Sequence, residues 1–421
     1  MKVLVVGSGG REHTIVWKLS QSKKVSKIYC APGNAGISQL AECVPIKVME
    51  FDKLVAFAKE NQIDMTVVAP DDPLAGGAVD AFEEAGLRAF GPRKNAAIIE
   101  GSKAFSKNLM KKYNIPTAGY EVFENSKDAI AYIKDNNKFP IVVKADGLAL
   151  GKGVIIAETF EDAEKAVLDI MEDKVFGAAG GKVVIEEFLT GPEISVLAFT
   201  DGKTLKPMVS AQDHKRALDN DKGLNTGGMG TFSPSRIYDE ALAEECMKNI
   251  FLPTMDAMNK EGRTFKGVLY FGLMKTPDGV KVIEYNCRFG DPETQVVLPR
   301  LKSDLYEIFD AIIDERLEDV EIEWDNGAAV CVVLASGGYP QKYNTGYEIS
   351  GLSDAEAMGA TIFHAGTKKD GDKFLTAGGR VLGVTATGDD LDDAIKNAYK
   401  YVEKVSFKDM HYRHDIGIKK N

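Results

Sequence analysis

The chain has few cysteines, no long apolar segment and a deficit of positive charge. Its 421 residues include five cysteines, an odd number in which no two form a CxxC pair. This usage argues against a disulfide framework or a zinc site and indicates a reducing compartment, which we expect to be the cytoplasm. No apolar run approaches the roughly 20 residues that cross a bilayer. The amino terminus, MKVLVVGSGG, lacks the apolar core and cleavage site of a signal peptide.

The deficit of positive charge excludes further classes of partner. Lys and Arg number 52 against 63 Asp and Glu, which gives a net charge of -11. We therefore expect no broad nucleic-acid or membrane surface, although a locally basic pocket can still bind an anionic small molecule. The chain is 44% hydrophobic and 27% charged, which is ordinary for a globular protein. At roughly 100–200 residues per domain, its length predicts two to four domains.

The order of the expected elements predicts an α/β protein with several domains. In the first hundred residues, short apolar strands alternate with helical patterns, with strands at 2–6, 27–30 and 65–68 and helices at 11–19, 51–61 and 78–85. This alternation predicts a parallel, Rossmann-like sheet covered by helices, with ligands at the carboxyl ends of its strands.

The order of expected helices and strands differs in the remainder of the chain. One continuous helix is expected over 97–113, and Pro116 marks a boundary after it. From 121 to 189 the pattern is strand, helix, strand with glycine-rich loops, and strands predominate from 191 to 323. The charged segment 315–326 is interpreted as a linker, and a further region of strands and one helix follows it.

A glycine turn, GSGGREH at 7–13, follows the first expected strand. Gly9 and Gly10 let backbone N–H groups approach a phosphate, and the dipole of the following helix favours an anion there. The turn is not a dinucleotide fingerprint, because Glu12 takes the place of the third glycine and no acid ends the second strand. We interpret it as a monophosphate site, with a turn that binds no ligand as the alternative.

A second glycine loop lies between expected strands at 141–143 and 154–157. It reads KADGLALGKG and runs from Lys144 to Gly153. Its glycines allow the loop to close over a phosphate chain, and Lys144 and Lys152 neutralise phosphate charge. A strand follows the loop and no Ser or Thr comes after Lys152, so it is not a P-loop. An ordinary hairpin turn is the alternative.

The strongest candidate site is the run from Glu284 to Asp291. Glu284 and Asn286 are two apart on an expected strand, so their side chains point to one face. A carboxylate and an amide oxygen suit Mg²⁺, which also takes phosphate oxygens as ligands. Arg288 follows on the same face and can pair with a carboxylate or phosphate, and Asp291 could hold an ammonium group. A surface ladder of ion pairs is the alternative.

Two weaker motifs complete the candidates. Glu186 and Glu187 end an expected strand and could accept hydrogen bonds from an adenine amino group and ribose hydroxyls, although such acids are usually solvated. The basic run QDHKR at 212–216 precedes a four-glycine loop at 223–230 and could form a second anion site. His214 could act as a general base, and a purely structural histidine is equally expected.

Taken together, these motifs resemble the ATP-grasp superfamily, and specifically the phosphoribosylamine–glycine ligase family. The resemblance covers essentially the whole chain. The matching runs are GSGGREH at 7–13, PGNAG at 32–36, EGSKAF at 100–105, KADGLALGKG at 144–153, QDHKR at 212–216, NTGGMG at 225–230, RFGDPETQ at 288–295, SGGYP at 336–340, HAGT at 364–367 and GGRVLGVTA at 378–386. The resemblance implies an amino-terminal α/β domain at 1–102, an ATP-grasp domain at 103–326 with a lid at about 121–190, and a carboxyl-terminal α+β domain at 328–421.

The resemblance also implies the ligands and their residues. The expected substrates are ATP, glycine and 5-phosphoribosylamine, with Mg²⁺ or Mn²⁺, and the expected product is glycinamide ribonucleotide. The implied roles are Lys103, Lys144, Gly151, Lys152 and Gly153 for the ATP phosphates, Glu186, Glu187, Leu189 and Glu193 for adenine and ribose, Glu284 and Asn286 for the metal, Arg288 and Asp291 for glycine, and Gly9, Gly10, Asn34, Asp213, Lys215 and Arg216 for the ribosylamine. Arg288, Asp291, Asp213 and His214 are the catalytic candidates. Asp71 stands where this family more often has glutamate, so its role is left open.

Other interpretations stay open on the sequence alone. A related ATP-grasp ligase could use a different acid or amine, and a nucleotide-binding sensor could lack turnover. A nicotinamide-dependent dehydrogenase is disfavoured by Glu12 and by the absence of a ribose-binding acid. We expect a monomer, with a dimer as the alternative.

Overall fold

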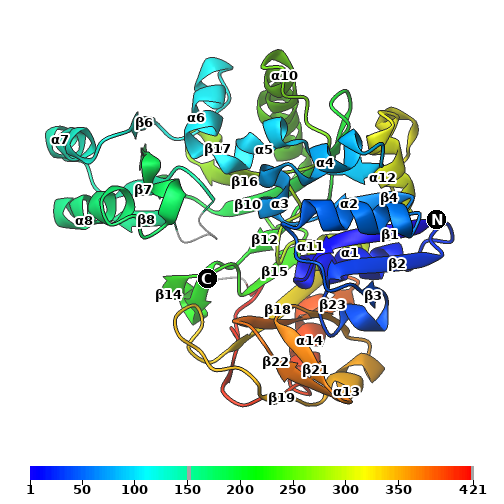
Figure 1. Ribbon diagram of the computed structural model, residues 1–421. Helices are drawn as coiled ribbons and strands as arrows, with labels where there is room; N and C mark the ends of the chain where they lie inside the picture. The colour runs from blue at the N-terminus through cyan, green and yellow to red at the C-terminus, as the bar shows by residue number, and fades with distance from the viewer. Residues whose placement is uncertain (149–152, 419–421) are drawn as a thin grey trace.

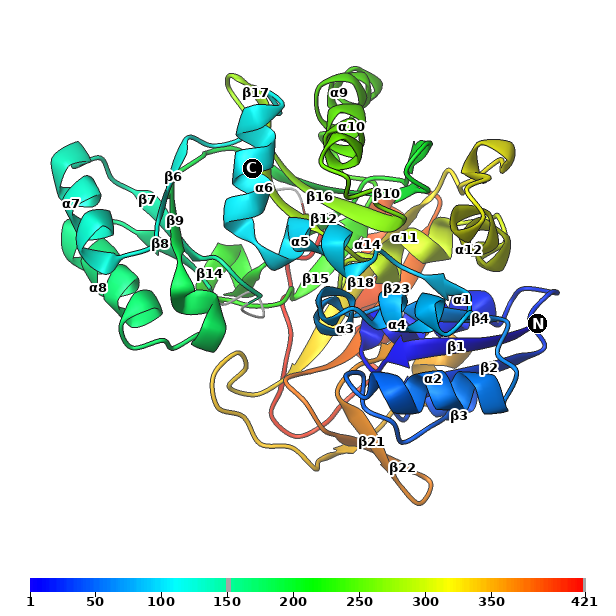
Figure 2. The same ribbon diagram turned by 45° about the horizontal axis from the view of Figure 1, so that its top comes forward.

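A computed structural model of the protein describes residues 1–148 and 153–418. Figure 1 shows the blue amino-terminal sheet at the right, a cyan-to-green unit that stands apart at the left, and an orange-to-red carboxyl-terminal unit below. Figure 2 shows the same separation from a second direction. No helix among the described residues is both long and apolar enough to cross a membrane.

The amino-terminal unit is a parallel sheet in the order β3-β2-β1-β4-β5. Its strands are β1 (Lys2–Gly7), β2 (Lys27–Pro32), β3 (Glu42–Cys43), β4 (Met65–Val68) and β5 (Ala89–Phe90), and its helices are α1 (Gly10–Leu19), α2 (Phe51–Glu60), α3 (Asp71–Gly76) and α4 (Ala78–Glu84). The valines of β1 are fully buried, as expected when helices cover both faces of a parallel sheet. The predicted Rossmann-like sheet is confirmed, and β1 ends at the glycine turn.

The continuous helix expected over 97–113 is wrong. The structure has two helices, α5 (Lys94–Gly101) and α6 (Lys103–Lys112), separated by Ser102 in an extended conformation. Ser102 Oγ accepts the N–H of Phe105 at 3.0 Å, and Asp146 Oδ1 accepts the N–H of Ala104 at 2.7 Å. These two acceptors satisfy N–H groups at the start of α6, and so they stabilise a new helix there.

The unit that stands apart in both views, residues 120–187, corresponds to the predicted lid and is given that name below. Its antiparallel sheet has the order β6-β9-β7-β8. The elements are β6 (Tyr120–Phe123), α7 (Ser126–Asn136), β7 (Ile141–Ala145), β8 (Val154–Ala157), α8 (Phe160–Met171) and β9 (Val183–Glu187). The two helices share an apolar core with the sheet, so the lid packs as a unit of its own.

A second antiparallel sheet faces the lid across α6 and has the order β11-β10-β16-β17. Its strands are β10 (Glu193–Thr200), β11 (Leu205–Pro207), β16 (Gly267–Thr276) and β17 (Gly279–Asn286). Four helices of this region were not predicted from the sequence: α9 (Glu240–Cys246), α10 (Leu252–Lys260), α11 (Thr294–Val297) and α12 (Leu305–Ile313). The supposed linker at 315–326 is also wrong in part, because Leu317 is fully buried in the core.

The carboxyl-terminal sheet has the order β12-β15-β18-β23-β20, with β24 paired to β18. Its strands are β12 (Gln212–Asp213), β15 (Gly230–Ser233), β18 (Ala328–Ser336), β20 (Thr361–His364), β23 (Arg380–Gly388) and β24 (Met410–His411), covered by α13 (Leu352–Ala357) and α14 (Leu391–Val402). A hairpin of β13 (Arg216–Leu218) and β14 (Lys222–Asn225) projects from it, and β19 (Glu348–Ile349), β21 (Thr367–Asp370) and β22 (Lys373–Thr376) form a separate small sheet. Strands β12 and β15 thus carry the QDHKR and glycine-loop motifs into the carboxyl-terminal sheet.

Candidate active site

The predicted run after β17 lies where elements from several parts of the chain meet. Asn286 Nδ2 donates to Glu100 Oε1 at 2.9 Å, and Arg288 Nη2 donates to the same oxygen at 2.8 Å. The more distant Asp71 Oδ2 lies 3.5 Å from Arg288 Nη2. Asn286 and Arg288 therefore converge as expected, whereas Glu284 takes a different partner, Lys215.

Glu284 belongs to a cluster of acids around one ammonium group. Lys215 Nζ lies 2.8 Å from Glu193 Oε2 and 3.7 Å from Glu284 Oε1. Burial opposes the charge of Glu284, but Lys215, Lys144, Lys103 and Arg288 hold its pKa below the ordinary value. A charged carboxylate at this position is what a hard cation requires.

Asp213 is the acid of this cluster that takes up a proton most readily. Burial, reinforced by Glu293 and by the acids around Lys215, raises the pKa of Asp213 to about 8, and Lys215 opposes this rise. The same acids keep the pKa of Lys215 well above its ordinary value, although burial lowers it. Asp213 therefore titrates in the range where a proton acceptor for an amine must work.

The predicted phosphate-binding lysines face this cluster from the lid side. Lys103 Nζ donates to the carbonyl of Gly147 at 2.9 Å, and Lys144 Nζ lies 3.0 Å from Glu186. Gly153 accepts the N–H of Ala145 at 2.9 Å, which closes the base of the glycine loop. The predicted Gly151 and Lys152 lie outside the described residues.

The two acids at the end of β9 have different surroundings. Glu186 is buried between Lys144 and Lys107, each at 3.0 Å. Glu187 is exposed, accepts the N–H of Gly119 at 3.0 Å and lies 3.3 Å from Lys281 Nζ. Leu189 follows the strand and is half-buried. Glu186 thus compensates part of the positive charge of Lys107 and Lys144. Lys107 was not among the residues predicted from the sequence.

The glycine turn after β1 lies against Asp291. A Cβ atom on Gly9 would come within 3.5 Å of Asp291 Oδ2, and one on Gly10 within 2.6 Å of Gln295 Nε2. The N–H of Gly9 is already taken by Glu12 at 2.6 Å, so Glu12, in the place of a third glycine, caps the helix. A side chain at Gly10 would require the Gln295 side chain to move.

Asp291 also receives a cation from the carboxyl-terminal unit. Arg380, at the start of β23, lies 3.3 Å from Asp291 Oδ2 and donates to the carbonyls of Asp291 at 2.9 Å and Gly227 at 2.8 Å. Burial would raise the pKa of Asp291, but Arg380, Arg11 and Arg288 keep it below the ordinary value. Asp291 is therefore charged, and its role in holding an ammonium group stays a prediction.

Asn34 has a structural role that the sequence did not reveal. Its Nδ2 donates to the carbonyls of Ser8 and His364, both at 2.8 Å, and its Oδ1 accepts the N–H groups of Gly36 and Ile37, both at 2.9 Å. The side chain thereby ties the loop after β2 to β20. Since this amide has used its hydrogen-bonding capacity, only the main chain of Asn34 is left for a substrate.

The side chains of the basic run after β12 contact different parts of the structure. The ring of His214 packs against Phe232 at a centroid distance of 5.8 Å. Arg216 Nη1 donates to the carbonyl of Gly223 within the hairpin. The catalytic role of His214 and the substrate-binding role of Arg216 therefore stay predictions.

The residues that sequence reasoning missed are Glu100, Lys107 and Arg380. Glu100 follows the apolar run Ala96–Ile99 in α5, and Arg380 starts an apolar strand. A charged residue in such a place is rarely buried without a partner, which is a signal in the sequence. Lys107 lies in a helix with three other lysines and gives no such signal. The partners themselves are far away in the chain, so the signal could not have identified them.

A metal fits the donors present, although the described residues form no cage made of protein ligands alone. No cluster of three or more His, Cys, Asp or Glu suited to a metal occurs within residues 1–148 and 153–418. Glu284 offers a charged carboxylate, and Asn286, whose Nδ2 is held by Glu100, keeps Oδ1 free of any donor in the described chain. Mg²⁺ is usually held by one or two such ligands together with substrate phosphates and water.

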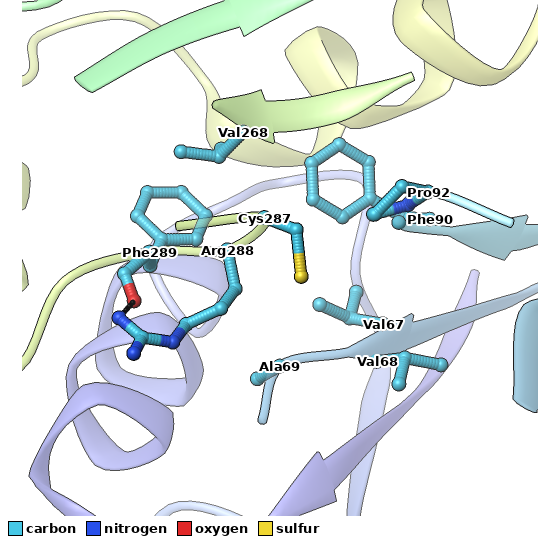
Figure 3. A pocket seen from close by; sticks show the side chains of 10 residues that line it. Val67, Val68, Ala69, Phe90, Pro92, Val268, Cys287, Arg288 and Phe289 are labelled. Atoms are coloured by element: carbon cyan, nitrogen blue, oxygen red, sulfur yellow. Dashed lines mark hydrogen bonds between the residues drawn. The ribbon is translucent and has the colours of Figure 1, made fainter. Parts of the chain in front are cut away.

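A small cavity lies behind Arg288, at the seam with the amino-terminal sheet. Figure 3 shows Cys287 Sγ among Val67, Val68 and Phe90, and the Arg288 guanidinium turned toward the carbonyl of Phe289, to which it donates at 3.2 Å. The cavity measures about 10 Å³, which is room for about one water molecule. It is part of the packing behind the site and not a substrate pocket.

Two small antiparallel sheets with lysines between them, facing a charged strand end, define the ATP-grasp class. Family models match as phosphoribosylglycinamide synthetase, with its N domain at residues 1–100, its ATP-grasp (A) domain at 101–294 and its C domain at 329–419. The chain belongs to this family, the phosphoribosylamine–glycine ligases.

Individual relatives match this chain over its full length. The chain is 52% identical to the phosphoribosylamine–glycine ligase of Halalkalibacterium halodurans, over 100% of this chain and 97% of that one. It is 51% identical to the enzyme of that name in Caldanaerobacter subterraneus, over 99% of each. The crystal structure of the Thermotoga maritima phosphoribosylamine–glycine ligase superposes with a TM-score of 0.85 at 35% identity, covering 99% of this chain and 100% of that one.

Proposed function

We propose that this protein joins glycine to 5-phosphoribosylamine, using ATP, to give glycinamide ribonucleotide, ADP and phosphate, a step of de novo purine biosynthesis. The observation that carries the proposal is the meeting of Asn286 and Arg288 with Glu100, and of Glu284 with Lys215, at the end of one strand. The names of the full-length relatives support the same activity. We further infer that the enzyme works in the cytoplasm, in keeping with its five free thiols.

The first step makes the glycine carboxylate reactive. A carboxylate oxygen attacks the γ-phosphorus of ATP, the bond to the β,γ-bridging oxygen breaks, and ADP leaves with that electron pair. Arg288 would orient the carboxylate and Asp291 the ammonium group of glycine. Lys103 and Lys144 would neutralise the phosphates, because phosphoryl transfer depends on positioning and charge compensation and needs no enzyme nucleophile.

The second step forms the amide. The amine of 5-phosphoribosylamine attacks the carbonyl carbon of glycyl-phosphate, inorganic phosphate leaves, and the nitrogen loses a proton. Asp213 is the group we assign as acceptor of that proton, since burial places its pKa near 8. The turn at Gly9 and Gly10, in which Glu12 accepts the Gly9 N–H, would hold the ribose phosphate. Closure of the lid would keep water from the acyl-phosphate.

Mg²⁺ or Mn²⁺, when bound, would compensate the negative charge of the ATP phosphates. Glu284 and Asn286 are the residues we assign to hold it. For the nucleotide itself, Glu186 and Glu187 lie at the end of β9, and Glu193 begins β10. We assign this edge to adenine and ribose.

Trapping of the intermediate tests the proposed function. The protein, MgATP and glycine are incubated with hydroxylamine in the absence of 5-phosphoribosylamine, and glycine hydroxamate is measured. We expect hydroxamate and ADP in equal amounts. Hydroxamate from another amino acid, with none from glycine, would assign the protein to a related ligase. ATP binding without ADP release under any of these conditions would make it a nucleotide sensor.

A further inference from the structure

The strand end after β17 is held by a carboxylate from a different domain. Glu100 Oε1 accepts from Asn286 Nδ2 at 2.9 Å and from Arg288 Nη2 at 2.8 Å, while Glu100 Oε2 accepts the N–H of Cys287 at 2.7 Å. One carboxylate therefore contacts three consecutive residues. We propose that Glu100 is a positioning residue that fixes the metal ligand Asn286 and the glycine-binding Arg288 together, so that metal binding and glycine binding depend on the same group.

The support under Glu100 is rigid. It lies in the last turn of α5, its exposure is 8%, and its neighbours Ala96, Ala97 and Ile99 are at most 1% exposed. Two residues later Ser102 starts α6, which carries Lys103. A site held within fractions of an ångström needs such a second layer of fixed partners. Here the second layer is a helix end that also sets the position of a phosphate-binding lysine.

The chemistry of the contacts decides how Asn286 is oriented. An ionised carboxylate only accepts hydrogen bonds, so Glu100 must face the amide nitrogen of Asn286. The amide oxygen then points away from Glu100 and is presented to a cation. If Glu100 were replaced by an amide, this preference would be lost, because an amide can face either end of Asn286.

The same carboxylate orients Arg288 and leaves one N–H donor of its guanidinium without a partner among the described residues. Nη2 is held by Glu100 and Nη1 donates to Phe289 O, while the buried Nε has no hydrogen-bond partner among the described residues. A guanidinium held on one side keeps its remaining donors for a ligand. Loss of Glu100 would release the guanidinium and the amide at once, and this shared effect separates the proposal from a general loss of stability.

The test uses Glu100→Gln with two comparison variants. Asp71→Asn removes the other acid near Arg288, at 3.5 Å, but leaves the contact to Asn286. Glu84→Gln makes the same chemical change at an exposed position of α4. Mn²⁺ binding in the presence of ADP is measured from the loss of the free Mn²⁺ signal in electron paramagnetic resonance. The KM for glycine is measured separately at saturating MgATP.

We expect Glu100→Gln to weaken Mn²⁺ binding and to raise the glycine KM, each by about 10- to 100-fold, the usual range for loss of a partner that orients a metal ligand. Asp71→Asn should change the glycine KM alone, and Glu84→Gln neither. If Glu100→Gln does not fold, Glu100→Asp keeps the charge on a shorter side chain and should shift both quantities by a smaller factor. Mn²⁺ and glycine binding both unchanged in a folded Glu100 variant, or a change in only one of them, would overturn the proposal.

The Mn²⁺ measurement and the glycine measurement together distinguish a failure of the positioning role from a failure of the proposed function. The glycine arm rests on the function proposed above, whereas Mn²⁺ binding with ADP does not depend on which acid is activated. If the substrate acid were another compound, glycine would have no effect in any variant, including the wild type. The Glu100→Gln variant would still lose Mn²⁺ affinity, so the positioning role would stand without the proposed substrate.

Discussion

Glu186 carries the negative charge for two buried ammonium groups, and its removal gives the sharpest prediction about stability. Lys107 and Lys144 each lie 3.0 Å from its carboxylate, and the three side chains are only 2%, 6% and 4% exposed in the order Lys107, Lys144, Glu186. Glu186→Gln keeps the shape of the side chain and removes its charge. Two cations would then share a neutral amide in the interior.

The expected cost follows from this burial. Removing one partner of a buried ion pair costs about 3–5 kcal/mol. Lys107 would keep hydrogen bonds to Thr117 Oγ1 at 2.8 Å and the carbonyl of Ala118 at 3.4 Å, and Lys144 a contact with the carbonyl of Ile283 at 3.4 Å. We therefore expect the lower end of the range, about 3 kcal/mol near neutral pH.

The cost should also depend on pH with a definite sign. Burial lowers the pKa of Lys107 to about 8, and Glu186 opposes this. Without Glu186 the pKa falls further, so the folded variant releases the proton at a lower pH than the wild type does. A depressed lysine pKa penalises the fold below that pKa and is relieved as pH rises. The difference in stability between the variant and the wild type should therefore narrow as the pH rises from 6 toward about 8.

Hydrogen exchange in β9 is the suitable assay. The lid has its own core, and chains of several domains need not unfold in one step, so the opening free energy of the amides at Val183–Glu187 is measured directly. The control is Lys107→Met, which keeps the pair of Glu186 with Lys144 and should cost no more than about 1 kcal/mol. Wild-type protection in Glu186→Gln, or a double variant less stable than Glu186→Gln alone, would refute the reasoning.

Three predictions concern the chemistry. Glu284→Gln should raise the Mg²⁺ concentration for half-maximal ADP release by at least about tenfold, because a charged ligand is lost; an unchanged Mg²⁺ titration contradicts the metal assignment. Arg288→Met should raise the glycine KM by about 100-fold, as expected for loss of a paired, charge-assisted contact of about 3 kcal/mol, and an unaltered glycine dependence would remove Arg288 from this role. If Asp213 accepts the amine proton as a carboxylate, kcat/KM should rise with pH through about 8, and Asp213→Asn should lower kcat by about 10²- to 10⁴-fold and abolish that rise. Persistence of the same rise in the variant would assign it to another group.

Local patterns were enough to predict most elements near the ends of the chain. The valine-rich β1, the helix after it and the alternation through β4 were predicted because burial on both faces leaves a continuous apolar run. The break between α5 and α6 was not predicted, because the helical period continues across Ser102. The acid that starts the second helix, Asp146, is 42 residues from the N–H that it accepts. Period and propensity report only on neighbours along the chain.

The same distinction holds at the site. The functional groups of the site could be identified from the sequence. They are two lysines around glycines, a carboxylate and an amide two apart on a strand, and a glycine turn after the first strand. Which charge meets which was decided by the tertiary structure. Glu100 and Asn286 are 186 residues apart, and Arg380 and Asp291 are 89 apart.

The amino-acid sequence by itself therefore determined the residue types of the site and the strands and turns that present them, since these depend on spacing along the chain. Only the tertiary structure decided that Glu100 holds Asn286 and Arg288, that the Asn34 amide is fully engaged, and that burial raises the pKa of Asp213 to about 8. Hydrogen-bond pairing and pKa values depend on burial and on the groups that folding brings within a few ångströms, and both are properties of the packed molecule.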